Sequence, residues 1–113
     1  LYWNAAKCDD LPEPLDLLAF DAAVNCGVGG SGLQLQRALN RLGARLKEDG
    51  AIGPLTLNAL RAAWKSDMWR VIAALLMQRV RWHNDIIGRD RTQLRFIHGW
   101  LNRILENSKT VGL

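Results

Sequence analysis

An acid and an amide lie four residues apart in an otherwise apolar stretch, FDAAVNCG at residues 20–27. Residues four apart share one face of a helix, so Asp21 and Asn25 should project together. Apolar surroundings disfavour the charged form of a carboxyl group and raise its pKa, which is one way to prepare a group for acid–base work. Asp21 is therefore a candidate for acid–base chemistry, with Asn25 as a hydrogen-bonding neighbour.

Sugar hydrolysis needs a protonated acid and usually a second carboxylate close to it. The chain has three glutamates, and each falls at a predicted helix end or in a turn, where a solvated or capping role is the simpler interpretation: Glu13, Glu48 and Glu106. Asp21 could serve as a second carboxylate. None of the glutamates is an evident partner for it.

Other reactive groups give weaker signals. His83 lies on an apolar stripe and His98 lies beside Gly-Trp, where structural histidines are expected rather than members of a nucleophilic triad. The glycine-rich run at 27–32 follows a helix and has no lysine after it, so it does not fit a phosphate-binding loop. Cys8 and Cys26 are interpreted as two thiols rather than a disulfide, and no metal or cofactor is expected.

A second informative segment, residues 33–60, joins a Leu-Gln helix to a turn and to the start of another helix. Glycines in the turn permit backbone conformations closed to other residues, and Asp and Thr side chains can bond to the turn. The spacing fits a ligand site and fits equally a helix connection that binds nothing. The candidate binding residues here are Gln36, Asp49, Gly50, Gly53 and Thr56.

Helices must position these groups, because the chain has almost no strand signal. The first helix is predicted over 14–26, and the second begins at Ser31 as N-cap and continues through Leu46. The third opens at Gly53-Pro54 and carries Leu57, Leu60 and Trp64 on its inner face. A fourth is capped by Ser66 or Asp67 and ends at Gly88, with an apolar side through Trp69, Ile72, Leu76, Val80, His83 and Ile87. A fifth begins at Asp90 or Thr92, and residues 107–113 are expected to fray.

The predicted fold is therefore all-α, with about five helices in a single domain over residues 1–113. The 113 residues are 49% hydrophobic and carry a net charge of +4, and no apolar run approaches the roughly 20 residues that a membrane span needs. A basic surface favours polyanions, which include nucleic acid, anionic lipid and the bacterial wall. A basic helical module that binds nucleic acid or protein stays open as an alternative, although nucleic acid is the less favoured partner.

The order of several motifs resembles the C-terminal part of the family 108 glycoside hydrolases, which are bacterial and phage lysozymes also known as secretion activator proteins. The resemblance covers nearly the whole chain. The Leu-Gln helix followed by Asp-Gly-x-x-Gly-Pro-x-Thr is similar to the signature of helical peptidoglycan-binding modules. The resemblance is carried by Tyr2-Trp3, Cys8-Asp9, Leu11-Pro12, the 20–25 stretch, Leu35-Gln36, Asp49-Gly50, Gly53-Pro54, Thr56, Arg79 and Phe96-x-x-Gly99-Trp100-Leu-Asn-Arg103.

Family resemblance implies a lysozyme-like helical fold and a muramidase that cuts between N-acetylmuramic acid and N-acetylglucosamine. It also implies synthesis in the cytoplasm and action in the periplasm or at the cell wall. The family's proposed catalytic glutamate lies in a Glu-Gly-Gly-Tyr segment that these 113 residues lack. The chain is therefore expected to bind the wall without lysing it; the alternative is a complete lytic enzyme with a further N-terminal segment.

The same resemblance suggests roles for individual groups. Asp21 and Asn25 would form one wall of a glycan groove, or would instead tie their helix to its neighbours. Trp100 could stack on a sugar, although its helical spacing with Phe96 favours core packing. The Tyr2-Trp3 end is expected to expose apolar surface, covered by a catalytic segment, a second copy or another partner.

Overall fold

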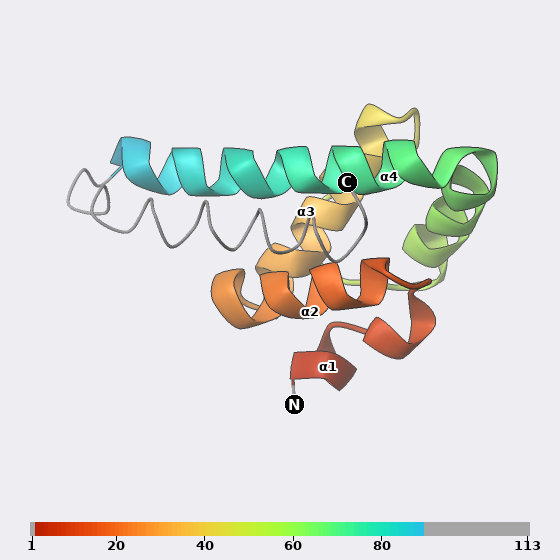
Figure 1. Cartoon of the computed structure of the whole chain (residues 1–113), viewed down its shortest axis with the longest axis horizontal. Coiled ribbons are helices and arrows are strands. Elements are labelled where there is room, and N and C mark those ends of the chain that lie inside the picture. The colour runs from red at the N-terminus through yellow and green to blue at the C-terminus, as the bar shows by residue number, and fades with distance from the viewer. Residues whose placement is uncertain (1, 90–113) are drawn as a thin grey trace.

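The computed structural model describes residues 2–89, with side chains described through residue 85. This part of the chain is helical between its connections and contains no strand: α1 spans Tyr2–Ala5, the short 3-10 helix η1 Cys8–Asp10, α2 Leu15–Cys26, α3 Val28–Arg41 and α4 Pro54–Arg89. α3 packs against both α2 and α4, and α1 lies at the outer side of α2 (Figure 1). The all-α prediction is confirmed. The predicted fifth helix, Trp100 and residues 107–113 lie outside the described residues.

The long helix α4 bends at Asp67, whose φ of −162° and ψ of 96° are not helical. The Oδ1 atom of Asp67 accepts a hydrogen bond from the backbone N–H of Arg70 at 3.2 Å, which is the contact that an N-cap side chain makes. Figure 1 shows the change of direction between the two parts of this helix. The predicted boundary between two helices at Ser66 or Asp67 is thus confirmed, with Asp67 as the cap.

The boundaries of α3 differ from the prediction. α3 begins at Val28, and Gly27, with φ of 83°, makes the break from α2. Ser31 is therefore inside the helix rather than its N-cap, and its buried hydroxyl donates to the carbonyl oxygen of Ala19 at 2.9 Å. The helix ends at Arg41, so Leu46 belongs to the connection that follows.

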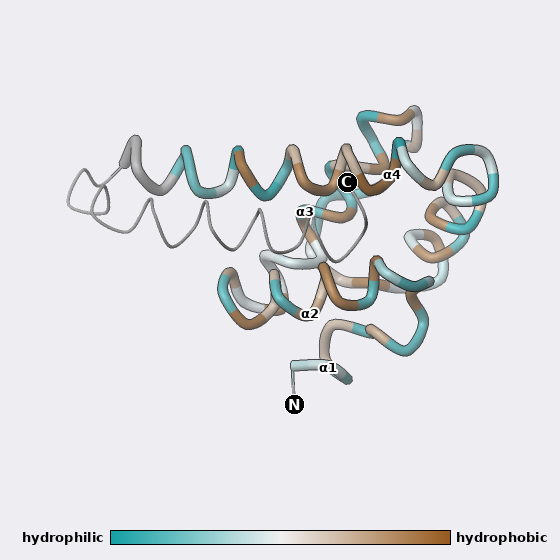
Figure 2. The backbone as a smooth tube through the Cα atoms, in the orientation of Figure 1, coloured by the Kyte–Doolittle hydropathy of each residue, from teal (hydrophilic) through white to brown (hydrophobic). Residues whose placement is uncertain are grey.

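The core is formed by residues of η1, α2, α3 and α4, and from α1 only the partly buried Trp3 packs against it. Its fully buried members include Leu15 of α2, Leu39 of α3, and Leu60 and Ile72 on the two sides of the bend. Brown apolar segments recur along α2 and along α4 after its bend (Figure 2). The predicted inner face of the third helix is confirmed, because Leu60 is buried and Leu57 and Trp64 pack against the core.

The predicted apolar side of the fourth helix is only partly right. Ile72 and His83 are buried, but Trp69 is 46% exposed, and Val71, Leu75 and Arg79 are buried instead. The buried face passes through Arg79, a residue that hydrophobic patterning assigns to the surface. Burial of that arginine depends on a partner from another helix, which periodicity cannot reveal.

Two glycines near the start of α3 differ sharply in their surroundings. A Cβ atom at Gly32 would overlap the backbone carbonyl of Gly50, whereas a Cβ at Gly29 would meet nothing within 4 Å. Gly32→Ala is expected to lower the free energy of unfolding by about 2 kcal/mol through overpacking. Gly29→Ala should be neutral or stabilising by about 0.5 kcal/mol, because Ala favours helix over Gly. Urea unfolding of both variants checks this, and equal stabilities would contradict the close approach of the connection to α3.

Candidate functional site

The connection between α3 and α4, residues 42–53, lacks regular structure and is held by side chains of α3. Gln36 is the centre of this network and is 1% exposed. Its Nε2 atom donates to Asp49 Oδ1 at 3.0 Å and to the Ala51 carbonyl at 2.9 Å, and Thr56 Oγ1 lies at 3.3 Å. Its Oε1 atom accepts from the Gly50 backbone N–H at 2.8 Å. One buried amide thus replaces the backbone pairing that a strand would supply.

Asn40 repeats this arrangement one turn later. Its Oδ1 accepts from the Leu46 backbone N–H at 2.8 Å, and its Nδ2 donates to the Leu46 carbonyl and to Glu48 Oε2, both at 3.0 Å. Arg37 adds an ion pair with Glu48 at 3.3 Å. Gln36 and Asn40 are four residues apart and share one helix face, so they form hydrogen bonds to successive parts of the connection.

The two turn glycines play different parts. Gly50 has φ of 78°, a backbone conformation that favours glycine. A Cβ atom there would also lie 2.7 Å from the Gly29 carbonyl oxygen, so both the conformation and the space require glycine. Gly53 has no positive φ, and a Cβ there would meet nothing. The expectation of a special conformation is confirmed for Gly50 and wrong for Gly53. Gly53 instead precedes α4 and accepts from the Leu57 N–H at 3.0 Å.

The connection, held in place by these hydrogen bonds, and the first turn of α4 form the walls of an open groove of about 360 Å³. Its walls are largely apolar, from Leu46 through Leu55, and its rim carries the cations Arg45 and Lys47 together with the carboxylate of Asp49. Leu55 is 78% exposed at this edge. The groove is lined by Gln36, Arg45, Leu46, Lys47, Asp49, Ala51, Ile52, Gly53, Pro54, Leu55 and Thr56.

The structure therefore brings five predicted site residues together around one loop. Of these, Gln36, Asp49, Gly53 and Thr56 line the groove, and Gly50 anchors the loop behind it. The exposed groove residues Arg45, Lys47 and Leu55 were missed by sequence reasoning. The only signal for them was their position immediately beside the Asp-Gly and Gly-Pro motifs.

Hydrogen bonds to the connection hold the pKa of both of its carboxyl groups down. The pKa of Asp49 lies below its usual value because the Gln36 amide and the Ala51 N–H donate to its carboxylate. The pKa of Glu48 is lowered first by the bond from Asn40 and then by Arg37. Both groups favour the folded loop in their charged form.

This predicts that the loop is sensitive to acid. Since both pKa values are lower in the folded state, their contribution is fully present above the ordinary values of 3.8 and 4.5 and is lost as pH falls through the lowered ones. The Gly50 amide signal in NMR should shift with this titration. Asp49→Asn keeps an oxygen acceptor for the loop but has no carboxyl group to titrate. It should therefore remove the Asp49 part of the pH dependence. A Gly50 signal unchanged down to pH of about 2 would contradict the network.

Asp21 and Asn25 lie together on α2, as their spacing predicts, but they do not line the groove. Asp21 Oδ2 pairs with the guanidinium of Arg79 on α4 at 2.9 Å, where the Arg79 side chain is 3% exposed. Arg79 also donates from Nε to His83 Nε2 at 3.1 Å. Asn25 donates to the Asp21 carbonyl at 2.8 Å and to its Oδ1 at 3.3 Å. In this structure the pair ties α2 to α4.

The ion pair of Asp21 with Arg79 was not predicted, although Arg79 is one of the residues that carry the family resemblance. The two residues are 58 positions apart, so no local pattern connects them. The sequence does place an acid on one apolar helix face and a cation on another. Because buried charges need partners, this pattern could have indicated the ion pair.

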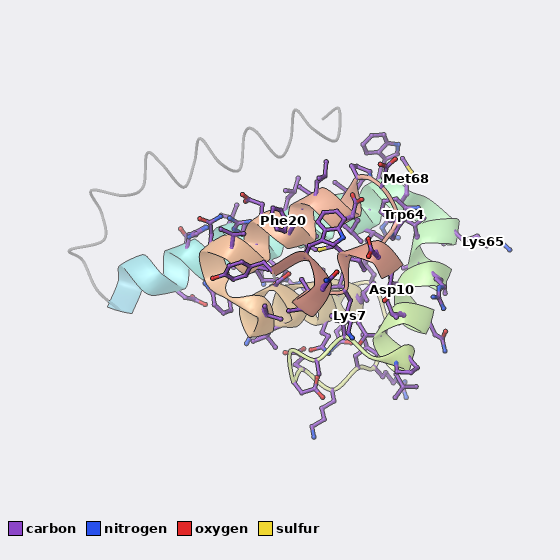
Figure 3. All side chains as sticks on the ribbon, turned by 90° about the horizontal axis from the view of Figure 1, so that it is seen from below. Lys7, Asp10, Phe20, Trp64, Lys65 and Met68 are labelled. Carbon is purple, nitrogen blue, oxygen red and sulfur yellow. The ribbon has the colours of Figure 1, made fainter. Side chains whose placement is uncertain are left out.

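The Tyr2-Trp3 end and α2 form an exposed aromatic and apolar face. Tyr2, Leu17, Phe20 and Val24 are all at least 36% exposed, and Figure 3 shows the molecule from the side of this face, with Phe20 labelled. Trp3 lies partly buried here: its Nε1 donates to Asp9 Oδ1 at 2.7 Å, and its ring centroid is 5.6 Å from that of Phe20. The expected exposure of apolar surface at this end is present.

The cysteines and other potential ligand groups add no further site. Cys8 and Cys26 are both free thiols, and burial first, with the nearby Asp16 and Asp9, raises the pKa of Cys8 to about 11. Within residues 2–89, no three His, Cys, Asp or Glu residues group as metal ligands. No described helix is both long enough and apolar enough to cross a bilayer.

The described residues thus form an all-helical unit with an open, loop-built groove, whose walls are largely apolar and whose rim carries charges of both signs. Comparison with known families identifies this unit. The family model described as Predicted Peptidoglycan domain matches residues 32–105, and the chain belongs to this family. The match includes α3 from residue 32 onward, the connection and α4, and therefore every residue of the groove.

A second family model, described as Glycosyl hydrolase 108, matches residues 1–27, the part that contains α1, η1 and α2. The two matches confirm the resemblance to the family 108 lysozymes and identify peptidoglycan as the partner, which associates the chain with the cell wall of bacteria or their phages. No curated protein and no solved structure matches the chain.

Proposed function

We propose that the chain recognises the glycan of peptidoglycan through the groove between α3 and α4, as the wall-recognition part of a muramidase of the N-acetylmuramic acid to N-acetylglucosamine bond. The observation that carries this proposal is the groove itself, built by the Gln36 network inside the peptidoglycan family match. Wall recognition by this chain requires no catalytic glutamate, and none is assigned to it.

The chemistry of the groove suits an N-acetylated sugar. Ile52, Pro54 and Leu55 offer apolar surface for an acetamido methyl group or a sugar face, and Arg45 and Lys47 offer donors at the rim. The lactyl group of muramic acid carries a carbonyl carbon that is either a carboxylate or an amide, and both accept hydrogen bonds from such donors.

Two kinds of residue then contribute to binding. Gln36, Gly50 and Thr56 act as positioning residues, because the Gln36 amide is already bonded inside the network and Thr56 is 4% exposed. Direct contact to sugar falls to Asp49 and to the exposed rim residues Arg45, Lys47 and Leu55. Gly53 contributes its open backbone at the groove edge.

Asp21 and Asn25 are assigned to a second part of the same glycan path, on the α2 face that belongs to the hydrolase match. Asn25 is exposed, and no hydrogen bond to a described residue uses its Oδ1, so this atom is accessible to a sugar hydroxyl or amide. Asp21 would orient Asn25 through their mutual hydrogen bond while it holds Arg79. A catalytic acid would have to come from outside the described residues.

Replacing Leu55 tests the groove directly. Leu55→Asp should lower affinity for purified, insoluble peptidoglycan about tenfold, because it removes apolar contact and adds a charge at the groove edge. The fold should persist, since an acid in the first turn of a helix is favourable. Met77→Asp is the control, because Met77 is also exposed on α4 and lies outside the groove. Sedimentation of each variant with wall material gives the affinities, and equal affinities for the two variants would refute the groove as the binding site.

A further inference from the structure

A second hollow, of about 240 Å³, lies between α3 and α4 and is not used by the proposed glycan site. Three arginines face it, two from α3 and one from α4, with one acid from the connection. Among the described residues it is lined by Arg37, Asn40, Arg41, Glu48, Gln78 and Arg81. The glycan groove and three further hollows of the described residues each gather two cations or fewer.

The charges in this hollow are not balanced. Glu48 is already engaged by Arg37 at 3.3 Å and by Asn40 at 3.0 Å. Arg41 and Arg81 have no hydrogen bond or ion pair with any described residue. Guanidinium groups that converge on one hollow repel each other, and an oxyanion between them would relieve this repulsion through charge-assisted bonds.

An amide side chain at the wall of the same hollow is free of hydrogen bonds to the described residues. Gln78 is 7% exposed, and its side chain makes no hydrogen bond to any described residue. Its amide atoms are not among the fully buried unbonded ones, so they are open to the hollow and available to a ligand there. A carboxamide offers both a donor and an acceptor, which is the pattern that a peptide group complements.

An adjoining hollow of about 440 Å³ shares Arg37 and adds apolar surface. Leu33 and the half-buried Trp82 line it together with Asp85. Apolar walls next to a cationic pocket and an amide suit a short acidic peptide with aliphatic side chains better than a phosphodiester chain, which has no amide and little apolar surface.

We propose that this arginine hollow binds the acidic stem peptide of peptidoglycan, with its carboxylates at Arg41 and Arg81 and a peptide group at Gln78. This inference rests on the proposed function, because it adds a peptide site to the glycan site. The connection serves both: Lys47 and Asp49 line the glycan groove, and Glu48 between them lines the arginine hollow. One loop therefore carries the sugar site on one side and the peptide site on the other.

The test uses two preparations of purified peptidoglycan, one intact and one stripped of its peptides by an amidase. Wild type should bind the intact wall about tenfold more tightly than the stripped glycan. Arg41→Gln and Arg81→Gln should each lower affinity for the intact wall about threefold, and the double variant should bind both preparations equally. Arg61→Gln, an exposed arginine of α4 outside the hollow, is the matched control and should bind like wild type.

The outcomes separate this inference from the proposed function. Equal wild-type affinity for intact and stripped wall, or arginine variants that lose affinity for both alike, would overturn the peptide site and leave glycan binding in place. Loss of the arginine dependence after chemical removal of wall phosphate polymers would also overturn it, in favour of a phosphodiester. Failure of wild type to bind either preparation would overturn both proposals.

Discussion

Asp21→Ala is expected to lower the free energy of unfolding by about 3 kcal/mol, because Arg79 would keep its charge inside the fold without its carboxylate partner. The Arg79 side chain is 3% exposed, and its bond to Asp21 is 2.9 Å long. The remaining contact to His83 at 3.1 Å does not neutralise a positive charge. Urea unfolding measures the loss.

A second variant separates a lost ion pair from a general defect in α2. In Asp21→Ala/Arg79→Met the charge is gone and the methionine fills similar space, so much of the lost stability should return. Asp10→Ala removes an exposed acid with no described side-chain bond and should change stability by less than about 0.5 kcal/mol. If the double variant is no more stable than Asp21→Ala, the buried arginine is not the cause.

Gln36→Leu is expected to lower the free energy of unfolding by about 3 kcal/mol and to abolish most wall binding. The leucine has a similar volume but leaves the Gly50 N–H and the Ala51 carbonyl without their partners, at 2.8 and 2.9 Å from the present amide. Release of the connection removes the wall of the groove that the connection forms and leaves only the first turn of α4. Affinity for purified peptidoglycan should therefore fall more than tenfold at a temperature where the helices stay folded.

The control for this substitution lies two residues earlier. Gln34 is also on α3 and is 1% exposed, but neither atom of its amide has a hydrogen-bond partner. Gln34→Leu should therefore be neutral or stabilising, since it removes an unsatisfied buried amide. Similar losses for the two variants would show that volume, rather than the hydrogen-bond network, decides the effect.

Local patterns in the sequence predicted the helices well where the deciding interaction was itself local. The helix over 14–26 matches α2, Leu15–Cys26, because apolar residues and the glycine that ends it are neighbours in the chain. The break at Asp67 was predictable because an N-cap bonds only three residues ahead.

Predictions failed where a distant segment decides. Ser31 looked like a helix cap, yet its hydroxyl bonds to Ala19, and the glycines around it lie in the helix, where Gly32 admits the backbone of Gly50. Trp69 looked buried, whereas Arg79 is buried through a partner 58 residues away. Such contacts leave no periodic signal on either segment.

The residues of the candidate site could be grouped from their spacing in the sequence, but their arrangement in space could not be predicted. Gln36, Asp49, Gly50 and Thr56 were grouped from spacing, and the structure joins them in one network. Asn40 repeats the role of Gln36 four residues later, the same spacing that separates Asn25 from Asp21. The exposed rim could not be predicted, because exposure depends on how the connection lies against α3.

The most direct test of the central claim is sedimentation of the 113-residue chain with purified peptidoglycan, beside DNA retention at increasing salt. The proposed function predicts saturable binding to the wall material without lysis, and weak DNA retention that salt removes. A chain that stays in the supernatant with peptidoglycan while it binds DNA would contradict wall recognition and favour a basic nucleic-acid module.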